Sequence, residues 1–325
     1  MHAHPSRSIR FALSLAAGLL VSAAAWPQTG AVHLVVPFAP GGAQDVIGRW
    51  FGDKLAQRLN VPVIVDNKAG AGGVLAADAV AKAAPDGLTL LLATGGAISI
   101  APHLNPKLPY DVKRDFVAVA MVADTPMTIA VKADSPYKSL ADVLRDAKAR
   151  PGVLAYASTG SGTVSHLTGA LLAQTAGVNL LHVPYKGAAP ALNDLLGGQL
   201  PLIVTSAASV DAMVEAGKVR VLATFSKTHL PNLANVPTVT EATGLAGLEV
   251  PVWVGFVAPA RTPPERLEKL AAELLAVCRL PETLERFRGL GTAPACAGRA
   301  ALEKVVADDT ARWAQVVRRG GISLD

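Results

Sequence analysis

The stretch that decides the fold is Val35-Val36-Pro37-Phe38-Ala39-Pro40-Gly41-Gly42-Ala43-Gln44-Asp45, which joins an apolar run to a helical pattern through prolines and glycines. Beyond it, apolar residues recur every four positions and predict one buried helix face: Ile47, Phe51, Leu55 and Leu59. The stretch therefore predicts a buried strand, a tight loop and a helix N-terminus. Such a terminus presents free backbone N–H groups, which suit a carboxylate or phosphate. An ordinary strand-to-helix turn that binds nothing would have the same pattern.

The same unit recurs along the chain. Apolar runs that predict buried strands lie at 61–65, 88–93, 117–122, 128–131, 154–157, 180–183, 202–204, 219–225 and 252–258. Glycine-containing loops and helical patterns separate many of them, and Ser139 is placed to cap one helix. This alternation indicates parallel sheets covered on both faces by helices.

Length and composition favour two folded units. A chain of 325 residues with 51% hydrophobic residues fits two domains. The chain is expected to cross from one unit to the other near 123–126 and to return after residue 225. We therefore predict one lobe from 31–125 plus 226–325, and a second lobe from 126–225. Ligands of open α/β sheets bind beyond the carboxyl ends of the strands, so a crevice between the lobes is the expected site.

The N-terminus has the pattern of an export signal. Arg7 and Arg10 precede an apolar stretch at 11–21, and small residues follow at 22–25. About eleven apolar residues are too few to cross a bilayer, which needs roughly 20. We predict a signal peptide at 1–25, cleavage near Ala25 and a soluble periplasmic protein. A retained membrane anchor is the alternative.

Charge and cysteine content exclude some functions and leave one alternative open. Removing residues 1–25 leaves 28 basic and 25 acidic residues, a net charge of +3 without a basic patch, so nucleic acid is not an expected partner. Cys278 and Cys296 are the only cysteines. In an oxidising compartment they are expected to form a disulfide, and two separate buried thiols are the alternative. Two cysteines without a nearby histidine make a poor metal site, and neither a metal nor a cofactor is predicted.

Many short motifs occur in one order from about residue 32 to the C-terminus. They lie at 36–42 (Val-Pro-Phe-Ala-Pro-Gly-Gly), 70–73, 84–87, 108–110, 156–158, 160–167, 182–187, 236–238 and 258–259, with Asp45 and Asn67. In this combination the chain resembles the periplasmic solute-binding proteins of tripartite tricarboxylate transporters, the TctC or Bug family. The resemblance implies an α/β, two-lobed type II periplasmic binding protein fold (Venus flytrap). Each lobe would be a mainly parallel sheet flanked by helices, and a hinge would close the lobes on the ligand.

The same resemblance implies a function. The chain would be a monomeric extracytoplasmic receptor for a small carboxylate, which it delivers to a membrane permease. The implied ligand contacts are Pro40, Gly41, Gly42, Ala43, Gln44, Asp45, Thr94, Ser158, Gly160, Gly162, Thr163, Ser165 and His166, with Tyr185 nearby and Thr205 at a strand end. A carboxylate has about four acceptor sites, which N–H groups, hydroxyls and waters can fill without a fixed cation.

Two positions depart from the family pattern and bear on the ligand. Gln44 stands where Thr or Ser is common, and its longer side chain could shrink the pocket. Amino-acid-binding members have an Asp at the end of the strand that here ends at Thr205. Without that acid an ammonium group has no evident partner. We therefore expect an unsubstituted or hydroxylated carboxylate rather than aspartate or glutamate.

Other interpretations remain open for several residues. Lys186 could pair with a ligand carboxylate or be a solvated lysine, and His182 is expected to be a core histidine. Asp45 is expected to bond N–H groups at the start of the first helix. A sensor that docks on a signalling partner is an alternative function, because it too needs a ligand-dependent closed shape. A serine hydrolase using Ser158, Ser161 or Ser165 with His166 is disfavoured, because Gly-x-Ser-x-Gly is absent.

Overall fold

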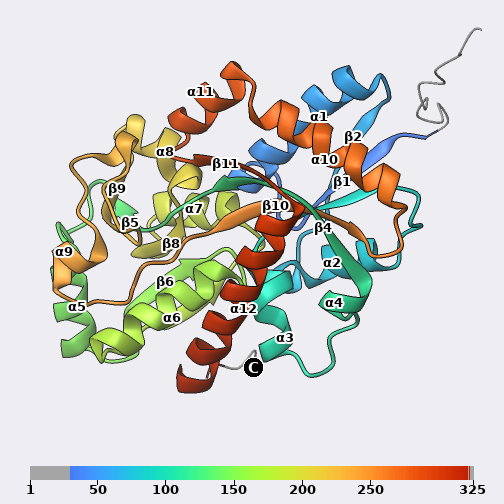
Figure 1. The fold of residues 1–325 in the computed structure, drawn as a ribbon. Coiled ribbons are helices and arrows are strands. Elements are labelled where there is room, and N and C mark those ends of the chain that lie inside the picture. Colours follow the sequence, from blue (N-terminus) through green and yellow to red (C-terminus); the bar gives the residue numbers. More distant parts are fainter. Residues whose placement is uncertain (1–29, 321, 323–325) are drawn as a thin grey trace, which may run out of the picture.

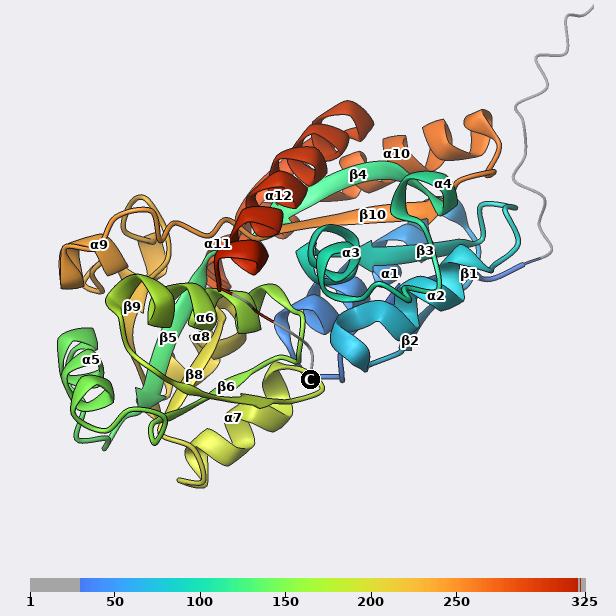
Figure 2. The ribbon, with the colours of Figure 1, turned by 90° about the horizontal axis from the view of Figure 1, so that it is seen from below.

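The computed structural model describes residues 30–320 and 322, and these residues form two α/β lobes side by side (Figures 1 and 2). A six-stranded sheet with the order β11-β4-β10-β3-β1-β2 organises one lobe. A five-stranded sheet with the order β7-β6-β8-β5-β9 organises the other. The expected two-lobed α/β fold is confirmed. The signal peptide predicted at 1–25 lies outside the described residues.

The first lobe begins with the predicted strand, loop and helix. Its first half contains β1 (Val32–Val36), α1 (Ala43–Leu59), β2 (Val63–Asn67), the short helix η1 (Ala71–Gly73), α2 (Val74–Ala81) and β3 (Thr89–Ala93). The π-helical turn η2 (Gly96–Ile100), α3 (Ala101–Leu104), α4 (Val112–Asp115) and β4 (Phe116–Asp124) follow. After the second lobe the chain returns with β10 (Trp253–Pro259), α10 (Pro264–Cys278), α11 (Pro281–Gly289), β11 (Ala293–Gly298) and α12 (Arg299–Gly320).

The second lobe repeats the strand–loop–helix unit. It contains β5 (Met127–Lys132), α5 (Leu140–Ala149), β6 (Ala155–Ser158), α6 (Val164–Ala176), β7 (Leu181–Pro184), α7 (Ala188–Leu196), β8 (Leu202–Ser206), α8 (Ala207–Glu215) and β9 (Val219–Thr224). The connection back contains η3 (Pro231–Leu233) and α9 (Val239–Thr243). Ser139 caps α5 as predicted, because its hydroxyl accepts from the Asp142 N–H while the Asp142 side chain accepts from the Ser139 N–H.

Each sheet is mixed, whereas a mainly parallel sheet was expected. The β-α-β segments are parallel, since β1 pairs in parallel with β2 and β3, and β6 with β7 and β8. However, β10 runs antiparallel to both β3 and β4, and β5 runs antiparallel to β8 and β9. The reason is the path of the chain, because β5 and β10 enter their sheets from the other lobe. The short edge strand β11 was not predicted; it pairs antiparallel with β4.

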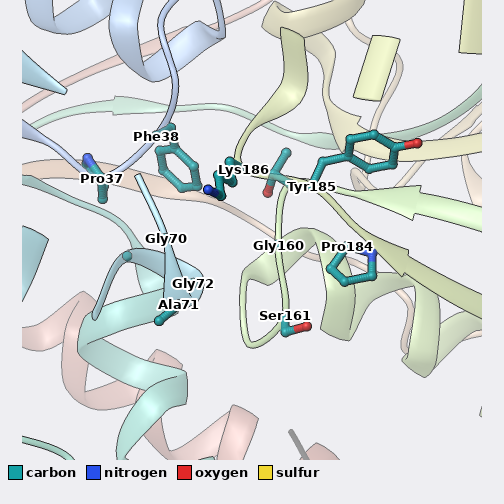
Figure 3. Close-up of a pocket in the computed structure, with 12 residues that line it drawn as sticks. Pro37, Phe38, Gly70, Ala71, Gly72, Gly160, Ser161, Pro184, Tyr185 and Lys186 are labelled. Atoms are coloured by element: carbon teal, nitrogen blue, oxygen red, sulfur yellow. The ribbon is translucent and has the colours of Figure 1, made fainter. Parts of the chain in front are cut away.

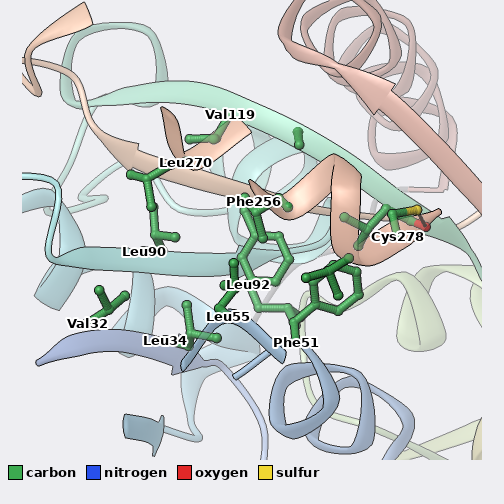
Figure 4. Close-up of a cluster of buried hydrophobic side chains, with 14 of the residues drawn as sticks. Val32, Leu34, Phe51, Leu55, Leu90, Leu92, Val119, Phe256, Leu270 and Cys278 are labelled. Atoms are coloured by element: carbon green, nitrogen blue, oxygen red, sulfur yellow. Dashed lines mark hydrogen bonds between the residues drawn. The ribbon is translucent and has the colours of Figure 1, made fainter. Parts of the chain in front are cut away.

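The predicted helix face is the centre of the first-lobe core (Figure 4). Phe51 and Leu55 of α1 are fully buried against β-strand residues that include Leu34 and Leu92. The Phe51 ring lies 5.4 Å from the ring of Phe256 on β10. Burying one such side chain stabilises the fold by roughly 1.5–3 kcal/mol. This packing fixes α1, and therefore the loop before it, relative to the sheet.

Three segments connect the lobes. Residues 125–126 lead out of the first lobe and 225–252 lead back, and the Thr125 N–H donates to the Val252 carbonyl at 2.8 Å. The third segment is α12, which lies across both lobes in Figure 2. Leu302 near its start packs in the first lobe, whereas Trp313 packs in the core of the second. Asp309 between them accepts from the Trp253 indole N–H at 2.9 Å.

A disulfide joins Cys278 at the end of α10 to Cys296 on β11, so the bonded alternative is the one that the structure contains. Its 18-residue span encloses α11. Within residues 30–320 and 322, no helix is long and apolar enough to cross a membrane. The same part of the chain holds no group of three His, Cys, Asp or Glu that could bind a metal ion.

Candidate functional site

The cleft between the lobes contains two neighbouring cavities. The hinge-side cavity, of about 20 Å³, is lined by Phe38, Gln44, Thr94, Met127, Thr159, Thr163, Val164, Ser165, Thr205, Ser206 and Val252. The loop-side cavity, of about 230 Å³, is lined by Pro37, Phe38, Gly70, Ala71, Gly72, Gly73, Thr159, Gly160, Ser161, Pro184, Tyr185 and Lys186 (Figure 3). Phe38 and Thr159 belong to both linings, so the two cavities adjoin.

The strand–loop–helix unit of the first lobe faces this cleft through the start of α1. The N-cap residue Gly42 makes no side-chain cap to α1, and within residues 30–320 the N–H groups of the first turn have one side-chain partner, the Ser209 hydroxyl. The Ala43 N–H reaches across the cleft to within 3.5 Å of the Ser209 hydroxyl on α8. Gly41 and Gly42 lie against the start of α7. Pro40, beside them, is exposed and lines neither cavity.

Asp45 is buried and holds the loop rather than a ligand. Its carboxylate accepts from the Gly41 N–H at 2.9 Å, from Arg49 Nε at 3.0 Å and from Asn67 Nδ2 at 2.9 Å. Burial alone would raise the pKa of Asp45, but the hydrogen bonds from Arg49, Gly41 and Asn67 hold it below its usual value. The expected bond to the helix start is therefore made to Gly41, just before the helix.

In the second lobe, the loop between β6 and α6 satisfies most of its own polar groups. The Gly160 N–H donates to the Ser158 hydroxyl, and the Gly162 N–H donates to His166 Nδ1. The Thr163 hydroxyl donates to the Gly160 carbonyl at 2.7 Å. Ser165 donates to the Val204 carbonyl at 2.5 Å, across to β8. The sequence-predicted contacts thus shape the loop, and Thr163, Ser165 and Gly160 are the ones among them that line the two cleft cavities.

His166 is placed away from the cleft, although it was predicted as a ligand contact. Its ring stacks on His182 with the ring centroids 3.8 Å apart, and both line a separate cavity beside α6. Burial lowers the pKa of His166 to about 4 and that of His182 to about 3. His182 Nε2 lies 2.6 Å from the Ser158 hydroxyl. The two imidazoles are therefore neutral and support the loop between β6 and α6 on the side away from the cleft. His166 accepts a hydrogen bond from the Gly162 N–H, and His182 is hydrogen-bonded to the Ser158 hydroxyl.

Three polar side chains face the hinge-side cavity without an internal partner. The Thr205 hydroxyl at the end of β8 is fully buried and has no hydrogen-bond partner among the described residues. Thr94 at the end of β3 and Gln44 on α1 also line this cavity, and within residues 30–320 no hydrogen bond holds their side chains. An unpaired buried hydroxyl costs roughly 1–3 kcal/mol. The cavity of about 20 Å³ has room for about one water-sized group, so the three side chains could bind one oxygen atom of a ligand.

Tyr185 lines the loop-side cavity, but its hydroxyl is engaged elsewhere. It donates to Asp194 on α7 at 2.5 Å, and Figure 3 shows it directed away from the labelled glycines. Tyr185 therefore lines the cavity without offering its hydroxyl to it. The Lys186 carbonyl beside it accepts from the Ala39 N–H at 2.9 Å and joins the lobes directly.

Sequence reasoning missed several lining residues. Phe38 lies inside the opening stretch but is not among the predicted ligand contacts, and neither is Thr159, the neighbour of the predicted Ser158. Met127 and Val252 line the hinge-side cavity because they lie where the chain crosses between the two lobes. The one sequence signal for any of these residues is the position of Phe38 next to the prolines and glycines of the predicted binding loop.

A family model described as the tripartite tricarboxylate transporter family receptor, TctC, matches residues 47–322. The chain belongs to this family. It is 35% identical over 305 residues to the protein BugT of Bordetella pertussis, covering 94% of this chain and 93% of the relative.

Solved structures of similar proteins agree with this family membership. The periplasmic binding protein BugD superposes with a TM-score of 0.86 at 36% identity, covering 90% of this chain and 98% of BugD. MatC from Rhodopseudomonas palustris, solved with bound malate, superposes with a TM-score of 0.84 at 33% identity, covering 88% of this chain and 98% of MatC. Members of the TctC family are periplasmic solute-binding receptors and not enzymes, which rules out the serine hydrolase.

Proposed function

We propose that this chain is an extracytoplasmic receptor that binds one small carboxylate between its lobes and delivers it to a tripartite tricarboxylate-type permease. The observation that carries the proposal is the buried, unpaired Thr205 hydroxyl, which faces the hinge-side cavity together with Thr94 and Gln44. Neutral donors of this kind can hold an anionic oxygen through hydrogen bonds, each of which contributes about 1.5–3 kcal/mol when one partner is charged. The malate in MatC supports a carboxylate as the ligand class.

The contacts proposed for the ligand combine both lobes. From the first lobe they are the backbone N–H groups of Ala43, Gln44 and Asp45, together with the side chains of Gln44 and Thr94. The second lobe contributes Thr205 and the loop whose shape Gly160, Gly162, Thr163 and Ser165 maintain. The lobes are proposed to be 31–125 plus 226–325 and 126–225, with a hinge at the crossings. A cleaved signal peptide at 1–25 would bring the receptor to the periplasm.

The absence of a carboxylate side chain from both cavity linings favours ligands without an ammonium group. We therefore propose an unsubstituted or hydroxylated carboxylate. If glutamate bound more tightly than succinate or citrate, this part of the proposal would be wrong.

Calorimetric titration of ligand-free protein with mono-, di- and tricarboxylates and amino acids tests the proposal. Thr94→Val should weaken binding of the preferred acid about tenfold or more, because one charge-assisted hydrogen bond is lost. Thr175→Val, which changes an exposed threonine on α6, should leave the affinity unchanged. Equal affinities of Thr94→Val and the wild type would contradict the proposed site.

The permease role is tested in cells. Deleting the gene should abolish uptake of the radiolabelled acid, and the intact protein should restore it. Unchanged uptake with an altered transcriptional response would instead favour the signalling receptor. Mass spectrometry of the periplasmic fraction should find a mature chain that starts near residue 26.

A further inference from the structure

A third cavity lies outside the cleft, between α6 and the end of α12. We call it the rear cavity; its lining includes the stacked histidine pair, His166 and His182, together with Tyr156 and Arg319. Its volume is about 400 Å³, against about 20 and about 230 Å³ for the cleft cavities, and it shares no lining residue with them. Figure 1 shows α6 beside the end of α12. The rear cavity is therefore a separate space in the second lobe.

The rear cavity has a buried floor, apolar walls and a polar rim. Tyr156 and His166 are only 2% and 7% exposed, so they form the floor. Gln174, Asn179 and Arg319 are exposed and form the rim. Outside the histidine pair, the other lining residues are alanine, valine, leucine and isoleucine. Such walls suit a molecule with an apolar body.

Hydrogen bonds to the cleft loop assign the proton of each imidazole. The Gly162 N–H donates to His166 Nδ1 at 3.2 Å, so the proton of this neutral ring is on Nε2. The Ser158 hydroxyl accepts from the Gly160 N–H, and in the described part of the chain its own proton has one acceptor, His182 Nε2 at 2.6 Å. The proton of His182 is therefore on Nδ1. Burial lowers the pKa of both rings, which keeps them neutral at neutral pH.

Each ring thus has one N–H group that the loop does not use. Neither His166 Nε2 nor His182 Nδ1 has a hydrogen-bond partner within residues 30–320 and 322, and both rings line the rear cavity. The rings are nearly parallel, at 13°, with centroids 3.8 Å apart, so one molecule can contact both. Arg319 is the one charged side chain of this lining, which contains no acidic residue. Two N–H donors beside a cation favour an anion.

The same proton positions argue against a metal ion. A histidine that ligates a metal through one nitrogen carries a proton on the other and donates it to a neighbour. Here the other nitrogen of each ring is already an acceptor, His166 Nδ1 from the Gly162 N–H and His182 Nε2 from the Ser158 hydroxyl. Binding a metal at this pair would break the bonds that support the cleft loop.

We propose that the rear cavity binds a small organic anion with an apolar body, and that its occupation strengthens ligand binding in the cleft. The anionic head accepts from the N–H groups of His166 and His182, and Arg319 attracts it from the rim. The apolar body lies against the α6 face that contains Ala170 and Ala173.

The loop between β6 and α6 couples the two sites. An anion that accepts from one nitrogen of an imidazole makes the other nitrogen a stronger acceptor, because linked hydrogen bonds polarise one another. The bonds from the Gly162 N–H and the Ser158 hydroxyl are strengthened, and the loop is held in the shape that lines the cleft. Only this coupling rests on the proposed function. By linkage, the cleft ligand raises the affinity for the rear anion by the same factor.

Benzoate and benzamide are matched probes, because they share a ring and differ in charge. Long-range ¹H–¹⁵N NMR of the ligand-free protein should find the protons on His166 Nε2 and His182 Nδ1. Benzoate should shift both imidazoles and leave those of His33 and His103 in place. Benzamide should need an about tenfold higher concentration, because its hydrogen bonds are not charge-assisted.

Two pairs of variants locate the site. Ala173→Trp puts a ring into the rear cavity and should abolish the shifts, whereas Thr175→Trp adds the same ring at an exposed position of α6 that does not line it. Arg319→Gln should weaken benzoate about threefold or more and leave benzamide unchanged. Its exposed neighbour Arg318 does not line the cavity, so Arg318→Gln should bind benzoate like the wild type. Melting curves check that each variant folds.

Calorimetry of the preferred cleft acid, with and without saturating benzoate, tests the coupling. Benzoate that competed inside the cleft would lower the affinity equally in Ala173→Trp, so the wild type is compared with that variant. The ratio of affinities with and without benzoate should be about twofold higher in the wild type, because two hydrogen bonds of the loop are strengthened.

Different outcomes separate this inference from the proposed function. Imidazoles that benzoate leaves unshifted, or shifts equally in Ala173→Trp, refute the rear site. Equal titration by benzamide, or an equal loss in Arg318→Gln and Arg319→Gln, refutes recognition of the anion. Equal affinity ratios in the wild type and Ala173→Trp refute the coupling. If no acid binds in the cleft, the proposed function fails, and the imidazole spectra still decide the rear site.

Discussion

Replacing Gly72 with alanine should hold the two lobes apart. Gly72 lies in η1 of the first lobe, and a Cβ atom built on it would lie 2.4 Å from the carbonyl oxygen of Ser161 in the second lobe. Ordinary van der Waals contact begins at 3.4 Å, so the two loops would have to separate by about 1 Å. Under the proposed hinge closure, this contact belongs to the closed arrangement, which a bound ligand would favour.

The size of the effect follows from the overlap. Inserting a methyl group into a packed contact typically costs about 1–3 kcal/mol, which corresponds to roughly 5- to 150-fold weaker ligand binding. Gly72 also has φ +63°, where a side chain costs about 1–2 kcal/mol whether the lobes are open or closed. That strain lowers the melting temperature but does not change the closing equilibrium.

Gly217→Ala separates the two effects. Gly217 has φ +65° and nothing within 4 Å of its hypothetical Cβ, so it reproduces the backbone strain without the overlap. Both variants should melt at a similarly lowered temperature. Only Gly72→Ala should weaken binding in calorimetry and enlarge the radius of gyration in small-angle X-ray scattering with ligand present. Wild-type affinity in Gly72→Ala, or an equal loss in Gly217→Ala, would refute closure through this glycine contact.

Three further predictions concern buried polar groups and the disulfide. Thr205→Val should weaken ligand binding tenfold or more yet leave the ligand-free protein as stable or about 1 kcal/mol more stable, since an unpaired hydroxyl is removed; a less stable apoprotein in chemical denaturation would contradict this. Reducing the Cys278–Cys296 bond should lower the free energy of unfolding by about 3 kcal/mol for its 18-residue loop, measured by denaturation with and without reductant. His166 and His182 have pKa values lowered from 6.5 to about 4 and about 3, so the unfolded chain binds more protons in between, and stability should fall as the pH drops from about 6.5 towards 3. His182→Gln should flatten that pH profile, and an unchanged profile would contradict the assignment.

The sequence by itself determined the local architecture of this protein. The apolar repeat every four residues placed α1, because side chains at that spacing share one face of a helix whatever surrounds it. Ser139 predicted the start of α5 because capping is made within one turn. Ordered glycine and proline motifs identified the family, and two cysteines in a chain predicted to be exported anticipated the disulfide.

Only the tertiary structure decided which polar groups remain free for a ligand. Ser158 and Thr205 look alike in sequence, as hydroxyls at strand ends, and Ser165 at the start of the next helix is a third candidate hydroxyl. Ser165 is bonded to the carbonyl of Val204, 39 residues away, and Ser158 is bonded to His182, whereas the Thr205 hydroxyl has no partner among the residues that the structure describes. A hydroxyl has the same short reach in every case, so its partner depends on which distant strand packs beside it. That packing is set by the long-range pairing of β6 with β7 and β8, which no local pattern specifies.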